Sequence, residues 1–153
     1  MINDTFDQVI AKFQEAASQF ANSDVKKIDE AIVLVMRHHD KRSIRPLLLS
    51  LNDTAKEDAG MFSLIHAAEA FDDDTYVNEF LAALPELRTK APKWTSIVLM
   101  RCLNNESTKA IMIRKLREAD SEVKQSVAWL CEKINECNPS FLNKTLAVLL
   151  AAK

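Results

Sequence analysis

The chain has 153 residues, of which 48% are hydrophobic and 27% charged, and its formal net charge at pH 7 is −2. These values are typical of one globular domain that folds without disulfides or metals, and the small net charge argues against a nucleic-acid-binding protein. One glycine and four prolines favour helices, since strands are usually separated by glycine-rich turns. No apolar segment reaches the roughly 18 residues of a membrane span, and the first residues lack the features of a signal peptide.

The three cysteines, Cys102, Cys131 and Cys137, are odd in number and lack the spacing of a disulfide framework. We therefore expect free thiols in a reducing compartment and a cytoplasmic protein. Each cysteine falls on or near an apolar stripe, so we expect all three to be small residues in or near the core.

Apolar residues at intervals of three and four predict helices along the whole chain. Asp24 can cap the second helix and Asp120 the eighth. Pro85 lacks an amide proton and is expected to kink or end the fifth helix, whereas Pro92 suits the first turn of the sixth. In chain order, the predicted helices cover about residues 6–20, 25–36, 44–51, 56–71, 75–84, 92–103, 106–119, 121–134 and 141–150.

These nine predicted helices are separated by short breaks, which favours antiparallel packing of sequential helices. The interval from one helix pair to the next is about 30–40 residues, a period typical of helical solenoids. We therefore predict an all-α fold in a single domain, residues 1–153, with stacked antiparallel helix pairs like those of HEAT or armadillo repeats. An irregular globular bundle is the alternative, because no signature residue recurs at a fixed offset.

Negative charge is concentrated between Asp53 and Glu86, where nine carboxylates accompany one base, Lys56, and the net charge is nine negative less one positive, or −8. Such a segment can offer an acidic surface to a basic partner. Asp72–Asp74 also suit the start of a helix, so capping and solubility are the alternative interpretation. A tyrosine beside carboxylates adds contact area to a binding surface. The predicted partner-binding residues are Glu69, Asp72, Asp73, Asp74, Tyr76 and Glu79, with Asp53, Glu57 and Asp58 as outlying candidates.

Other polar groups suggest no catalytic or metal site. His38 and His39 are adjacent, so on a helix their rings would point about 100° apart and would not share a zinc ion; we expect a polar helix end there. His66 is expected to be a partly buried packing residue. No glycine-rich phosphate loop, HExxH, CxxC or nucleophile elbow occurs, and the acidic segment lacks the spacing of a calcium loop. We therefore expect no catalytic residue, metal or cofactor.

One segment resembles a known family. Leu84–Leu87, Ala91–Trp94 and Val98–Glu106 form a stretch of about 25 residues that is similar to small, all-helical bacterial immunity proteins of polymorphic-toxin and contact-dependent growth-inhibition systems. In that family a tryptophan is followed by an apolar helix and an Arg-x-Leu-Asn ending. Cys102 stands here at a position where an aliphatic residue is expected.

The resemblance implies a function as well as a fold. Such proteins bind a cognate toxin domain in the producing cell and block its active site or substrate path, and many of these toxins are nucleases with basic surfaces. The acidic segment of this chain fits a basic toxin partner. Two alternatives remain: a HEAT-like scaffold or adaptor that binds another protein or peptide, and an enzyme whose site combines His66 with nearby carboxylates.

Overall fold

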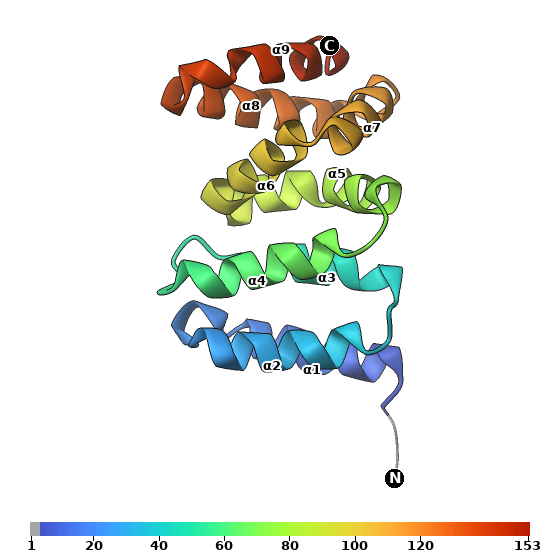
Figure 1. Cartoon of the computed structure of the whole chain (residues 1–153), viewed down its shortest axis with the longest axis vertical. Helices are drawn as coiled ribbons and strands as arrows, with labels where there is room; N and C mark the ends of the chain where they lie inside the picture. Colours follow the sequence, from blue (N-terminus) through green and yellow to red (C-terminus); the bar gives the residue numbers. More distant parts are fainter. Residues whose placement is uncertain (1–3) are drawn as a thin grey trace. The chain divides into compact units, whose positions relative to one another are not determined.

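The computed structural model describes residues 4–153, and within them it contains nine α-helices and no strand (Figure 1). The predicted all-α class and the number of helices are therefore confirmed. In the part of the chain that is described, no helix has both the length and the apolar character needed to cross a membrane. The helices are α1 (Phe6–Ala17), α2 (Val25–Met36), α3 (Ile44–Leu49), α4 (Asp58–Glu69), α5 (Asp73–Lys90), α6 (Pro92–Asn104), α7 (Glu106–Arg117), α8 (Ser121–Cys137) and α9 (Leu142–Ala151).

Side-chain caps begin several helices where the sequence places polar residues before an apolar stripe. The Asp24 carboxylate accepts a hydrogen bond from the Lys27 backbone N–H at 3.0 Å, and Asp120 caps α8 through the Val123 N–H at 2.9 Å. At α1, Thr5 and Gln8 form a reciprocal capping box. These bonds satisfy amide groups that have no partner within the first turn.

The fifth helix departs from the prediction. Pro85 was expected to kink or end it; the predicted end was wrong, because α5 continues to Lys90 with Pro85 inside. The reason lies in packing, because Leu84 and Leu87 on either side of the proline are both fully buried. Burial of such side chains contributes about 1.5–3 kcal/mol each, which can offset the roughly 3 kcal/mol that a proline costs inside a helix. Pro92 occupies the first turn of α6 as predicted.

Contacts along the chain fall into two compact units, which we call unit 1 (through Phe71) and unit 2 (Asp72–Lys153). Each unit is described by itself below. The prediction of one domain over residues 1–153 stays a prediction, as does the assignment to HEAT- or armadillo-like repeats.

In unit 1, α1 packs on α2, and both α2 and α3 pack on α4 (Figure 1). At Gly60 on α4, an added Cβ atom would lie 2.4 Å from Cδ1 of Ile28 on α2. A larger residue at this position would therefore have to displace the end of the Ile28 side chain. The core of unit 1 is almost entirely aliphatic and includes Ile28, Ile44, Leu47, Leu48, Leu51, Met61, Leu64 and Ile65.

In unit 2, α5 packs on α6, α7 and α8, while α9 packs mainly on α7 and α8. Trp94 at the start of α6 is 1% exposed, and Phe80 of α5 is fully buried. The Thr95 hydroxyl donates a hydrogen bond to the Ala91 carbonyl at 2.6 Å, which ties the start of α6 to the end of α5.

Candidate functional site

The start of α5 carries three successive carboxylates, and each has a different role. Asp72 is the N-cap residue: its carboxylate accepts hydrogen bonds from the Thr75 backbone N–H at 3.0 Å and from the Thr75 hydroxyl at 2.8 Å. Asp73 and Asp74 lie in the first turn, where negative charge interacts favourably with the helix dipole. The capping interpretation is therefore confirmed for Asp72.

Asp74 is ion-paired within unit 2. One of its carboxylate oxygens lies 2.9 Å from the Arg114 guanidinium and the other lies 3.4 Å from the Lys115 ammonium, both on α7. Asp74 and Arg114 are 58% and 67% exposed, so water screens this pair and its contribution to stability is at most about 1 kcal/mol. Its main effect is local neutralisation, because two cations lie against the predicted acidic surface.

Tyr76 and Glu79 follow one turn later, and the structure separates them. Tyr76 is 2% exposed and lies among buried residues of unit 2, with Val77 and Phe80 beside it on α5. Its ring therefore packs in the core and offers little area to a partner. Glu79 is half-buried. The exposed carboxylates at the start of α5 thus lack an exposed aromatic neighbour on that helix.

In unit 1 the predicted acidic residues divide between the two ends of α4. Glu57 is the N-cap residue and Asp58 the first residue of the helix, with Asp53 in the preceding loop. Glu69 is the last residue of α4. A helix rises 1.5 Å per residue, so Asp58 and Glu69 lie about 16 Å apart along its axis. Asp53, Glu57 and Asp58 therefore do not share a cluster with Glu69, which is close in sequence to Asp72.

Large exposed hydrophobic side chains lie elsewhere. Among the described residues, none between 53 and 86 belongs to this group; its members are Val33 and Leu34 on α2 and Leu142, Leu146 and Leu150 on α9. Protein interfaces usually take most of their affinity from a few buried apolar or aromatic anchors. The charge pattern did not reveal these leucines. The sequence feature that could have revealed them is that α9 has apolar residues on nearly every side, so that one apolar face is left uncovered when the helix packs.

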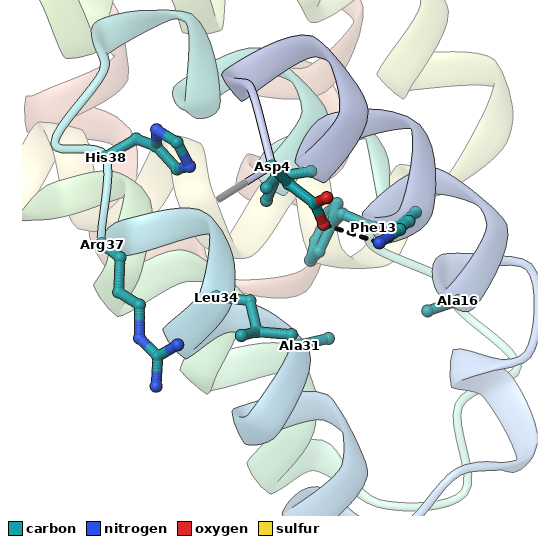
Figure 2. Close-up of a pocket in the computed structure, with 9 residues that line it drawn as sticks. Asp4, Phe13, Ala16, Ala31, Leu34, Arg37 and His38 are labelled. Atoms are coloured by element: carbon teal, nitrogen blue, oxygen red, sulfur yellow. Dashed lines mark hydrogen bonds and ion pairs between the residues drawn. The ribbon is translucent and has the colours of Figure 1, made fainter. Parts of the chain in front are cut away.

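A groove of about 520 Å³ lies between α1 and α2 in unit 1 (Figure 2). Figure 2 shows Phe13 and Ala16 from α1 and Ala31 and Leu34 from α2 around it. An ion pair of 2.6 Å joins Lys12 to Asp4 beside this apolar surface. The complete lining is Asp4, Val9, Lys12, Phe13, Ala16, Ala31, Leu34, Arg37 and His38.

The histidines lie in polar, exposed settings. The His38 ring makes an edge contact with Phe6, at 5.8 Å between ring centroids, and His39 has a positive φ of 46° in the turn after α2. His66 is exposed on α4, so the expected partial burial was wrong, because the core face of that helix is formed by Met61, Leu64, Ile65 and Ala68. No cluster of metal-binding side chains is found among residues 4–153.

Next to the histidines, Asp40 and Arg42 form a two-pronged contact, with Nη2 of Arg42 2.7 Å from Oδ2 of Asp40. Hydrogen bonds from the Arg42 side chain and backbone hold the pKa of Asp40 below its usual range. The Arg42 guanidinium also lies 4.4 Å from the centroid of the Phe6 ring. This arrangement connects the start of α1 to the loop after α2.

The cysteines are free, and two of the three lie in the core. Cys102 and Cys131 are buried, but Cys137 is exposed. The expectation was therefore wrong for Cys137, which is the last residue of α8 and lies beyond the last buried position of that helix, Ile134. Burial, together with the neighbouring Glu132 charge, raises the pKa of the Cys131 thiol to about 12. That thiol stays protonated and unreactive at neutral pH.

The all-α fold, the charged helix starts and the uncovered leucines together define a small helical protein with surfaces suited to binding another protein. The chain belongs to the Immunity protein 30 family, which matches residues 6–112. The matched span includes α1 to α6 and the first half of α7, whereas α8 and α9 follow it. No curated protein and no solved structure matches the chain.

Proposed function

We propose that this protein binds a cognate toxin domain with a basic surface, such as a nuclease, and blocks its active site or substrate path. Membership of an immunity-protein family indicates the neutralisation of a toxin, and this is the observation that carries the proposal. The family match favours this function over the adaptor and over an enzyme containing His66. We further propose that the protein acts in the cytoplasm of the producing cell; free cysteines are typical of that reducing compartment.

The proposed docking surface in unit 2 is the acidic start of α5, and Glu69 of unit 1 is proposed as a separate contact. Asp73 has a smaller structural role than its two neighbours. Asp72 caps the helix, and Asp74 pairs with Arg114 and Lys115. A basic partner would compete with these two cations for Asp74. The Arg114 pair is exposed and screened by water, so breaking it costs little free energy. Charge complementarity of this kind mainly raises the association rate and selects the partner.

The remaining predicted residues have secondary places in the proposal. Asp53, Glu57 and Asp58 lie at the opposite end of α4 from Glu69 and would contribute long-range attraction. Glu79 is half-buried and lies one to two turns after Asp74, where it would extend the surface along α5. Tyr76 is assigned a supporting role, since its buried ring packs beneath the first turns of the helix.

The first experiment identifies the toxin. The full chain is used as bait in a pulldown from the native strain, and bound proteins are identified by mass spectrometry. We expect a toxin domain, encoded beside this gene, that is inhibited by the purified chain in a direct activity assay. Absence of inhibition by a stoichiometric excess of the chain would overturn the proposal.

The second experiment locates the surface with a matched pair of variants. Asp73→Lys with Asp74→Lys reverses two charges in the first turn of α5, and Glu57→Lys with Asp58→Lys makes the same total change at the start of α4. Asp72 is left intact because it caps the helix. We expect the α5 variant to lose protection and the α4 variant to retain most of it, with equal helical circular dichroism. Equal loss in both variants would show that only total charge matters.

A further inference from the structure

The exposed face of α9 contains three leucines and the polar residue Asn143. Leu142, Leu146 and Leu150 are 51%, 51% and 58% exposed and recur every four residues, so they form one ridge along the helix. The opposite face contains Thr145 and Val148, which are fully buried against unit 2. A helix that is apolar on both faces is usually covered on both.

A groove of about 420 Å³ adjoins this ridge, and its walls have the spacing of helix ridges. Ile113 and Arg117, four residues apart, line it from α7. Leu150 and the two small residues Ala147 and Ala151, also four residues apart, line it from α9. Rows of side chains spaced by four are the rows between which a ridge of another helix packs, and small residues let its backbone approach closely.

The charges around the groove are positive. Arg117 and Lys153 line it, and none of the described lining residues is acidic. A third cation is near, because the Lys124 ammonium donates a hydrogen bond to the Lys153 main-chain oxygen at 3.5 Å. On α9 itself the only charged residue is Lys144, whose ammonium lies 5.1 Å from the Phe141 ring centroid. The apolar ridge is therefore accompanied by cations.

We propose that the groove between α7 and α9 binds an amphipathic α-helix of a partner protein, whose apolar ridge lies on Ala147 and Ala151 and whose flanking carboxylates pair with Arg117 and Lys153. The apolar ridges favour a helix, and the cations favour an acidic one. The same face of a second copy would oppose cations to cations, which disfavours self-association through it. All six residues that line the groove lie after residue 112, where the family match ends, and the inference does not depend on the proposed function.

The test uses two synthetic helical probes of about 16 residues, somewhat longer than α9 so that they span the groove. Both carry leucines on one face; the acidic probe has glutamates beside them and the basic probe has lysines at the same positions. Binding to the full chain is measured by fluorescence anisotropy. We expect the acidic probe to bind at least about tenfold more tightly than the basic one, a difference that salt reduces.

A charge swap makes the test specific. In the variant Arg117→Glu with Lys153→Glu, we expect the preference to reverse in favour of the basic probe, which misfolding could not cause. The matched control Lys26→Glu with Lys27→Glu changes the total charge equally on exposed positions of α2 and should keep the original preference. Leu150→Asp should abolish binding of both probes at unchanged circular dichroism.

Other results would overturn the proposal. Failure of the acidic probe to bind, equal binding of both probes, or an unchanged preference in the charge swap would each contradict it. Sedimentation that shows a dimer, which Leu150→Asp dissociates, would assign the face to a second copy. Cosedimentation with phosphatidylglycerol vesicles, lost in Leu150→Asp, would assign it to an anionic lipid surface.

Discussion

Two regions of unit 2 show opposite combinations of charge and apolar exposure. The start of α5 has three carboxylates but no large exposed hydrophobic residue among those described, whereas α9 has three exposed leucines beside a groove lined by two cations. Carboxylates at the start of α5 can attract a basic partner from a distance. Uncovered leucines can supply much of the binding energy of an interface when a partner buries them. In unit 2, the conspicuous charge pattern and the largest exposed hydrophobic side chains therefore lie on different helices.

The largest expected effect is the difference in reactivity between two thiols of α8, the buried Cys131 and the exposed Cys137. At pH 8 the Cys131 thiol, with its pKa of about 12, is ionised in only about one molecule in ten thousand, and burial also excludes reagents. We expect Cys137 to react with a thiol-specific chromogenic reagent at least about a thousandfold faster than Cys131. Cys137→Ser should remove the fast phase; a fast phase that persists would show that α8 opens readily.

The same thiol predicts the alkaline stability of unit 2. The pKa of this thiol is raised in the folded protein, so between about pH 9 and pH 12 the thiol ionises readily only in the unfolded chain. The free energy of unfolding is therefore unaffected by this group below about pH 9 and decreases as the pH rises towards 12. Urea unfolding at several pH values measures this decrease. It should be absent in Cys131→Ala, and an equal decrease in that variant would assign the effect to other groups.

A third prediction separates the two faces of α9. Val148→Ala removes buried methyl groups and should lower the free energy of unfolding by about 2 kcal/mol. Leu150 is 58% exposed, so Leu150→Ala should change the free energy of unfolding by no more than about 0.5 kcal/mol. Urea denaturation at pH 7 measures both values. A large cost for Leu150→Ala would mean that the exposed leucine already packs within the protein.

A fourth prediction concerns the effect of the start of α5 on association kinetics. With the toxin identified, Asp73→Lys and Asp74→Lys together should lower the association rate at least about tenfold at low salt, with a smaller change in the dissociation rate. The difference from the native chain should vanish at high salt because the charges are then screened. Stopped-flow or surface-binding kinetics provide the measurement. A change confined to dissociation would place these residues at the centre of the interface.

The smallest effects distinguish a cap from an ion pair. Asp72→Ala removes two hydrogen bonds to Thr75 and should cost about 1 kcal/mol of stability. Asp74→Ala removes exposed ion pairs to α7 and should cost no more than about 0.5 kcal/mol. Thermal or urea unfolding compares the two. The reverse order would indicate that the link between α5 and α7 is worth more than the helix cap.

The sequence by itself determined the all-α class, the nine helices and most of their boundaries, because apolar periodicity and side-chain caps are local properties of about four consecutive residues. It also contained the immunity-family signal. The tertiary structure decided that Pro85 lies inside a helix, that Tyr76 is buried and that Asp74 pairs with α7 forty residues later. It likewise decided which face of α9 is left uncovered. These outcomes depend on which helices pack together, and that is set by the burial of side chains distant in sequence, which no local pattern records.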